Sequence, residues 1–141
     1  MTETTTGAIG HIHDLLARKG YAVSEVGENI LTIQDVETGV SLRAVLEGKI
    51  LYFSLLCLIA PASRLTAPVM RKMLSAENGI ATSYFQLYDA ANNQVAITLN
   101  NFCKLQDLGP DDEDDILSCV SFLLADVVHA KQLLGPDLQA A

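Results

Sequence analysis

Apolar residues along this chain follow two spacings, and the change from one to the other predicts its helices and strands. The first apolar set has the spacing of one helical face and consists of Ile9, Ile12, Leu15 and Leu16. The elements predicted after it are strands over 30–36, 40–47 and 50–60, a helix over 66–78, a hairpin over 83–99 and a helix over 111–134.

Glycines lie where one periodic segment ends and the next begins. Because glycine tolerates positive φ, it is common at helix ends and in tight turns, and Gly20, Gly79 and Gly135 are expected to end the three helices. The order α-β-β-β-α-β-β-α predicts an α+β fold, a single antiparallel sheet of about five strands with helices packed on it. No repeat or linker divides the chain, so residues 1–141 are expected to form one domain, with 1–7 as a disordered tail.

The strand over 50–60 is apolar on both faces, which is typical of a strand covered on both sides. Two sets of residues share a face of their strand: Tyr52, Leu56 and Leu58 in this strand, and Tyr84 and Tyr88 in the first strand of the hairpin. A tyrosine ring with its polar tip suits a partly wet recognition surface. Most apolar strand residues pack in a core, so two interpretations stay open: these residues complete the core, or they bind a protein partner.

The last helix carries more apolar residues than contact with one sheet requires. A second apolar stripe runs beside the main one and includes Leu117, Leu124 and Val128. We predict that these three residues form a seam with a second copy of the chain or with another partner.

Composition favours a covered surface beyond the core. Hydrophobic residues make up 50% of the 141 residues and charged residues 18%, below the usual share of about 25%. An apolar surplus in a small domain is typical of a dimer interface or a ligand groove.

The net charge of −8 disfavours nucleic acid and anionic membranes as partners. The apolar run 50–60 is shorter than the roughly 20 residues that span a bilayer, so no membrane insertion is expected.

The acidic run Asp111–Asp115 is the first candidate for chemistry. It lacks the ligand spacing of a calcium loop, and carboxylates at a helix N-terminus are favoured by the helix dipole. We therefore prefer a structural role for it. The histidines form no cluster, because His11 and His13 point to opposite sides of a helix and His129 is distant in sequence.

Cys57, Cys103 and Cys119 have no C-x-x-C spacing and lie in apolar segments, so they are expected to be reduced core thiols of a cytoplasmic protein. The sequence contains no nucleophile elbow, dinucleotide-binding fingerprint or phosphate loop. We therefore predict no catalytic, cofactor-binding or metal-binding residues, no cofactor and no enzymatic activity.

The segment Met70–Asn78, followed by a strand-turn-strand and a long amphipathic helix, looks like the leucine-rich helix of a known superfamily that closes on an asparagine. Together with the order of elements, the mass of 15.2 kDa and the low pI, it resembles the type III secretion chaperone-like superfamily, which holds small acidic effector chaperones and YbjN-like proteins. The resemblance covers residues 9–134. It implies a bacterial, cytoplasmic homodimer without catalysis, on which an extended segment of a client protein lies.

Three hypotheses remain. The first is a homodimeric chaperone-like protein that binds an extended segment of a secreted effector. The second is a YbjN-like regulatory or adaptor domain that binds a folded protein partner and has no role in secretion. The third is an enzyme or metal protein built around the acidic run or His129, and we rank it last.

Overall fold

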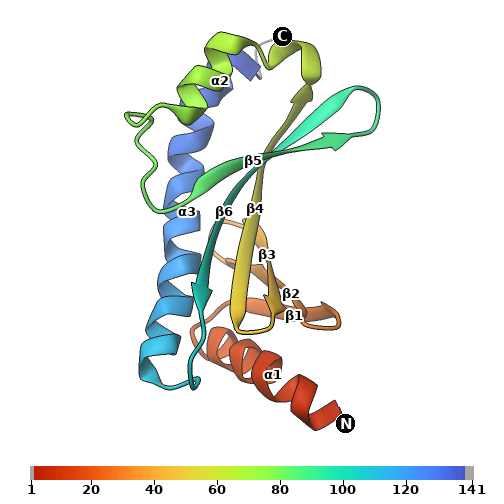
Figure 1. Cartoon of the computed structure of the whole chain (residues 1–141), viewed down its shortest axis with the longest axis vertical. Coiled ribbons are helices and arrows are strands. Elements are labelled where there is room, and N and C mark those ends of the chain that lie inside the picture. The colour runs from red at the N-terminus through yellow and green to blue at the C-terminus, as the bar shows by residue number, and fades with distance from the viewer. Residues whose placement is uncertain (1, 139–141) are drawn as a thin grey trace. The chain divides into compact units, whose positions relative to one another are not determined.

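The computed structural model describes residues 2–138, which form three α-helices, six strands and one short 3-10 helix (Figure 1). The helices are α1 (Thr2–Arg18), η1 (Ala62–Arg64), α2 (Ala67–Leu74) and α3 (Pro110–Leu138). The strands are β1 (Ala22–Gly27), β2 (Ile30–Gln34), β3 (Ser41–Glu47), β4 (Ile50–Pro61), β5 (Tyr84–Ala90) and β6 (Gln94–Lys104).

The six strands form one antiparallel sheet in the order β1-β2-β3-β4-β6-β5. This confirms the predicted α+β fold with a single antiparallel sheet, although six strands stand where about five were predicted. The additional strand is β1, which lies at the sheet edge and has mostly exposed side chains. An edge strand with few buried residues needs no apolar alternation, so the sequence pattern gave no signal for it.

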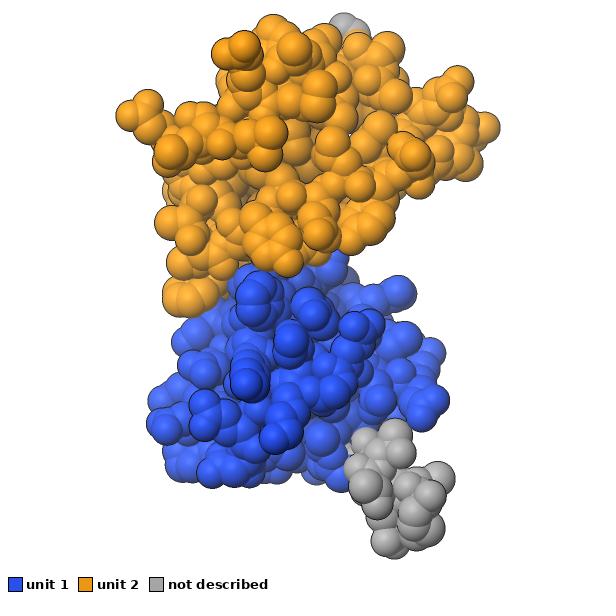
Figure 2. Space-filling view, in the orientation of Figure 1, with its two compact units in different colours: residues 1–54, 101–121 blue, residues 55–100, 122–141 orange. Residues whose placement is uncertain are grey.

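The chain forms two compact units, which Figure 2 distinguishes by colour. Unit 1 consists of residues 1–54 and 101–121, and unit 2 consists of residues 55–100 and 122–141. The chain passes from one unit to the other within β4, β6 and α3. In unit 1, α1 packs against β1 and β2. The four apolar residues predicted for its inner face are all buried, which confirms the predicted helical stripe.

Alternate residues of β6 define the two faces of the sheet. In unit 1 the Asn101 amide donates a hydrogen bond to the carbonyl oxygen of Cys119 in α3, at 3.0 Å, so the odd-numbered residues of β6 face this helix. These odd-numbered residues are buried along the whole strand: Val95, Ile97, Leu99, Asn101 and Cys103. The even-numbered residues therefore lie on the opposite face, which is the face of interest below.

Gly20 ends α1, as predicted. Its φ of 99° lies in the left-handed region that favours glycine, and the N–H of Tyr21 donates to the carbonyl of Leu16 at 3.2 Å. This is the hydrogen-bond pattern of a glycine-terminated helix.

Other helix ends correct the predictions. Helix α1 begins at Thr2, within the segment 1–7 for which a tail was predicted; Met1 lies outside the described residues. Helix α2 ends at Leu74 instead of continuing to Gly79, since Ser75 leaves the helical region with ψ of 140°. Helix α3 continues past Gly135 and includes Pro136 before it ends at Leu138, which is buried.

By length and composition α3 meets the criteria for a membrane-crossing helix, with a mean hydropathy of 1.4 over its most apolar window. A core helix of a soluble protein meets the same criteria. The stripe predicted along α3 is buried, and so is the carboxylate of Asp126 in its middle. The buried residues of that stripe are Ile116, Val120, Leu123, Val127 and Leu134.

Candidate protein-binding surface

Strand β5 is the edge of the sheet in unit 2, and it pairs only with β6 among the described strands. Most of its side chains are exposed on both faces, including Tyr84 at 43% and Tyr88 at 50%. Leu87, on the other face, is exposed as well. An edge strand with free backbone groups and uncovered apolar side chains is a template for pairing with another chain.

The pairing of β5 with β6 assigns its side chains to faces. Tyr84 lies opposite Asn100 and Tyr88 opposite Ala96, so both tyrosines share the even-numbered face of β6. Leu87 lies opposite Ile97, on the face that carries the buried core residues. This confirms the prediction that Tyr84 and Tyr88 share one face, opposite to Leu87.

A ladder of polar contacts lies between the tyrosines. The Asn100 amide donates to the Thr98 hydroxyl at 2.9 Å and to the Tyr84 carbonyl at 3.3 Å. The Thr98 hydroxyl donates to the Gln86 carbonyl at 3.4 Å, and the Tyr88 hydroxyl donates to Gln86 Oε1 at 2.7 Å. Because these polar groups already have partners within the chain, covering the surface does not leave them unpaired, and the exposed rings remain available for contact.

Strand β4 contributes two large exposed apolar side chains to unit 2, Leu56 and Ile59. The prediction that Leu58 lies on an open face is wrong, since Leu58 is 7% exposed and Ile59 is 53% exposed. Two consecutive buried residues, Cys57 and Leu58, shift the alternation of β4 by one position. Leu58 therefore joins the buried set together with Ala60, and Ile59 takes the exposed position.

Tyr52, the remaining predicted residue of β4, belongs to unit 1. It is partly exposed, and its ring contacts that of Phe102, with centroids 6.0 Å apart and planes at 50°. Tilted rings at this distance stabilise each other, so Tyr52 and Phe102 form a small aromatic pair on the surface of unit 1.

Contacts to α3 and to the hairpin turn hold β5 in place. The carboxylate of Asp126 in α3 accepts hydrogen bonds from Thr82 at 2.6 Å and Ser83 at 2.8 Å, directly before the strand begins. At the turn, Asn92 and Asn93 have φ of 63° and 58°. Two consecutive positive φ values allow a tight hairpin. The Asn93 carbonyl also accepts the N–H of Ala62 at 2.8 Å, which fixes the turn to η1.

Asn78 orders the loop between α2 and β5. Its amide donates to the Met73 carbonyl at 2.6 Å, and its Oδ1 accepts the N–H of Ile80 at 2.9 Å. The asparagine that was expected to close the helix therefore acts beyond the helix end, by satisfying one helix carbonyl and one loop N–H.

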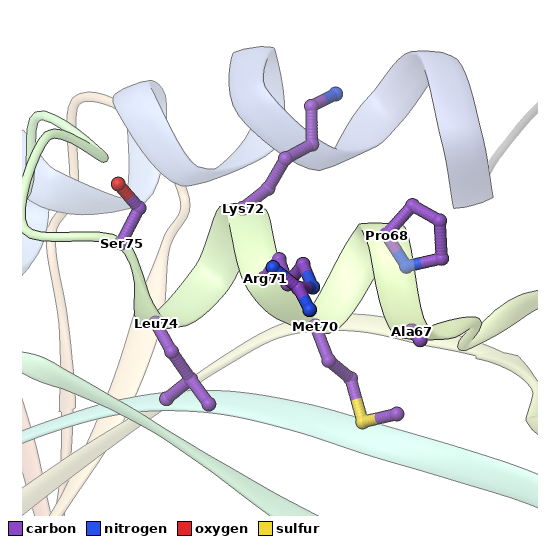
Figure 3. Close-up of a pocket in the computed structure, with 7 residues that line it drawn as sticks. All are labelled: Ala67, Pro68, Met70, Arg71, Lys72, Leu74 and Ser75. Atoms are coloured by element: carbon purple, nitrogen blue, oxygen red, sulfur yellow. The ribbon is translucent and has the colours of Figure 1, made fainter.

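Helix α2 presents a second apolar surface in unit 2 (Figure 3). The large apolar side chains of this helix form two pairs with a spacing of four: Val69 and Met73 are buried, while Met70 and Leu74 are exposed. An open groove of about 650 Å³ runs along the helix, lined by Ala67, Pro68, Met70, Arg71, Lys72, Leu74 and Ser75. Lys72 points toward α3, where its ammonium pairs with Asp137 at 2.7 Å.

The predicted seam on α3 is only partly exposed. Leu117 in unit 1 and Leu124 in unit 2 are half-buried, and Val128 in unit 2 is exposed. Phe122, which was not predicted as a seam residue, is exposed as well. Leu124 and Val128 lie four residues apart and therefore share one side of the helix.

Charge divides unequally between the units. Of the 9 basic and 17 acidic residues of the chain, unit 2 has four of each, Arg64, Arg71, Lys72 and Lys131 against Glu77, Asp89, Asp126 and Asp137. The remaining five basic and thirteen acidic residues belong to unit 1, so the whole net charge of −8 belongs to it. Among the described residues, nine of the thirteen exposed large apolar side chains lie in unit 2. Unit 2 is therefore the neutral unit with the apolar surface.

The acidic run has a structural role at the start of α3. Asp112 is buried, and its Oδ2 accepts backbone N–H groups from Gln106, Asp107 and Leu108 at 2.8, 3.0 and 2.7 Å. Burial opposes the charged form, but the three N–H donors together hold the pKa of Asp112 below its ordinary value. Glu113 accepts a hydrogen bond from His11 Nε2 at 3.0 Å, which ties α1 to α3 within unit 1.

No candidate metal site emerges within residues 2–138. No group of three or more His, Cys, Asp or Glu side chains comes close enough to hold a metal ion in this part of the chain. His129 is exposed. Cys57, Cys103 and Cys119 are buried and free, which confirms their predicted place in the core.

The fold is similar to that of YbjN, a protein of known structure. One matching solved structure is the crystal structure of YbjN from E. coli, which is described as a proposed transcription regulator. The match has a TM-score of 0.64 and 12% identity, and it covers 88% of this chain and 90% of that chain. At this identity the likeness shows the fold. It supports the YbjN-like part of the resemblance and not the secretion-chaperone part. No family model and no curated protein matches the chain.

Proposed function

We propose that this chain is a non-catalytic protein-binding domain, which binds an extended segment of a partner along β5 and acts as a homodimer. One observation carries the proposal: β5 is an edge strand whose side chains are exposed on both faces. An added strand gains main-chain hydrogen bonds, and its alternate side chains meet Tyr84 and Tyr88 on one face and Leu87 on the other.

The surroundings of β5 support a specific partner. An exposed apolar edge strand promotes aggregation with other chains. Proteins protect such edges with charged residues or proline, or cover them with a helix or loop. Among the residues of β5 only Asp89 carries a charge, and none is proline. Unit 2 as a whole has no net charge to repel another chain. A partner segment that pairs with β5 covers this edge and so prevents aggregation through it.

A regulatory or adaptor domain that binds a folded partner is the second candidate, and the groove along α2 favours it. Met70 and Leu74 expose apolar side chains beside the cationic side chain of Arg71. A short open groove of this kind accepts single protruding side chains from a folded surface, whereas an extended segment needs a continuous strand edge.

The experiment compares binding by the wild-type chain and by the double variant Tyr84→Asp, Tyr88→Asp. Partners are captured from a native lysate, identified by mass spectrometry and divided into synthetic peptides. We expect one short peptide to bind alone, to protect the β5 amides from hydrogen exchange, and to lose at least tenfold in affinity with the variant. The matched control is Val36→Asp, an exposed valine of unit 1.

The outcomes separate the candidates. Binding by the intact partner but by none of its peptides favours the adaptor. A partner that is exported from the cell extends the first proposal to an effector chaperone. Capture that is unchanged in the double variant, with β5 amides unprotected, rules out β5 as the binding edge.

A further inference from the structure

Helix α2 of unit 2 exposes residues with the spacing of one helical face. Four exposed residues stand at positions i, i+3, i+4 and i+7, and we call them the α2 stripe: Ala67, Met70, Arg71 and Leu74. Leu74 is 80% exposed, more than any other large apolar side chain among the described residues. The helix already buries a separate pair of side chains, so the stripe is a second face that packing within unit 2 does not use.

Helix α2 presents this stripe on a fixed support. Lys72 Nζ donates to the Asp137 carboxylate at 2.7 Å and to the Leu133 carbonyl at 3.3 Å, both in α3. Figure 3 shows Lys72 pointing toward α3, away from Met70 and Leu74. A partner therefore meets a surface that is already ordered, and it loses less conformational entropy on binding.

Charge distinguishes between the possible occupants of the stripe. Helix α2 contains two cations, Arg71 and Lys72, and no acidic residue. Lys72 is paired with Asp137, whereas Arg71 has no ion-pair partner within residues 2–138. Arg71 lies near the middle of the stripe, so a two-fold pairing of α2 with a second copy would bring two arginines together. A partner with carboxylates is complementary, and a second copy of this helix is not.

The geometry of the stripe favours a helical partner. The interior main-chain groups of α2 are engaged within the helix, so an extended segment gains no main-chain hydrogen bonds here. Recognition depends on side chains, which project at intervals of three and four residues over two turns, roughly 10 Å. The side-chain ridges of another helix have the same spacing and fit such a surface.

We propose that the α2 stripe binds an amphipathic helix of a partner protein, whose apolar side chains pack on Met70 and Leu74 and whose carboxylate pairs with Arg71. The proposal rests on the adaptor candidate above, because it names the kind of partner that occupies the groove along α2. It is independent of strand addition at β5, since no residue of β5 belongs to the stripe.

The test selects helices from a displayed library against the folded full-length chain. The library holds helix-forming peptides of about 20 residues, with apolar residues along one helical face and a random choice of Glu, Lys, Gln or Ala elsewhere. We expect the selected peptides to contain more Glu than Lys beside the apolar face and to protect the α2 amides from hydrogen exchange. Their affinity should fall at least tenfold with Leu74→Asp and with Arg71→Glu.

Matched controls separate the stripe from general charge and apolar effects. Val36→Asp is the control for Leu74→Asp, and Lys131→Glu, an exposed cation of α3 in unit 2, is the control for Arg71→Glu. Both controls and the β5 double variant should bind the selected peptides as the wild type does. Replacing the critical Glu of a peptide by Lys should restore its binding to the Arg71→Glu chain to within about threefold. This charge exchange carries the test should Leu74→Asp fold poorly by circular dichroism.

Each remaining outcome overturns the helical occupant in a distinct way. Selected helices without a preference for Glu, or with unchanged affinity for both stripe variants, show that the stripe does not bind them. A Leu74→Asp chain whose mass in light scattering falls to that of one chain shows that a second copy covers the stripe. Protection of the α2 amides by an intact captured partner, but by no helix, leaves the adaptor candidate standing without a helical partner. Loss of peptide binding in the β5 double variant places the site on β5 instead.

Discussion

At the scale of single residues, Asp112 has a stronger structural role than its place in an acidic run indicates. Its carboxylate accepts three consecutive backbone N–H groups of the loop between β6 and α3. These donors have no strand or helix partner of their own, and an unpaired buried N–H is costly. One charged acceptor therefore determines the path of the loop, while Asp111, Asp114 and Asp115 remain exposed.

Replacing Asp112 by Asn is expected to lower the free energy of unfolding by about 2–3 kcal/mol at pH 7, because a charged acceptor of three N–H groups is lost. The folded pKa lies below the ordinary value of 3.8, so this stabilisation is present above about pH 4 and is lost as the pH falls through the folded pKa. Urea unfolding at pH 7 and pH 3 measures both effects.

The matched control is Asp114→Asn, an exposed member of the same run, for which a change of at most about 0.5 kcal/mol is expected. The Asp112→Asn difference from wild type should shrink at pH 3. A penalty that is equal at both pH values contradicts the assignment of the stabilisation to the ionised carboxylate.

The sequence predicted some of these residue roles and missed others for a physical reason. Tyr84 and Tyr88 alternate with other residues, so their shared face followed from the strand period alone. Leu58 and Ile59 lie in an uninterrupted apolar run, where a shift of alternation by one residue changes no residue type. No pattern in such a run distinguishes the buried neighbour from the exposed one.

At the scale of elements, the position of β5 depends on the loop that precedes it. Asp126 is a buried residue of α3, beside the buried apolar stripe of this helix, and it holds the loop to α3. Sequence periodicity places Asp126 beside the buried stripe but gives it no partner, because Thr82 and Ser83 lie more than forty residues away. Contacts of this kind require the tertiary structure, whereas the helix and the hairpin themselves were predicted from local spacing.

Replacing Asp126 by Ala is expected to loosen the start of β5. The two hydroxyl groups lose their charged acceptor, so the amides of residues 82–86 should exchange hydrogen at least tenfold faster, and affinity for a partner segment should fall. Hydrogen-exchange mass spectrometry measures the first effect and titration with the captured peptide the second. Asp89→Asn, an exposed acid at the end of the same strand, is the control. Unchanged exchange in this segment contradicts the anchoring role.

At the scale of the whole molecule, acidity and apolar exposure belong to different units. The sequence totals predicted both a negative charge and an apolar surplus, but totals do not reveal that the first belongs to unit 1 and the second mainly to unit 2. This division matters for function. A charge of −8 opposes unspecific association and keeps the chain soluble, while a neutral unit accepts another chain without charge repulsion.

The proposed homodimer can be tested through the separation of charge in unit 1 from exposed apolar residues in unit 2. Light scattering should give twice the 15.2 kDa of one chain, and Val128→Asp should return the mass to that of a single chain that keeps its secondary structure by circular dichroism. Val36→Asp, a valine exposed in unit 1, should leave the dimer intact. Because unit 2 carries equal numbers of acidic and basic residues, the dimer should persist from low to high salt. A dimer that dissociates as salt is added is held by ion pairs and not by the apolar side of α3, and a single-chain mass at every concentration excludes the homodimer altogether.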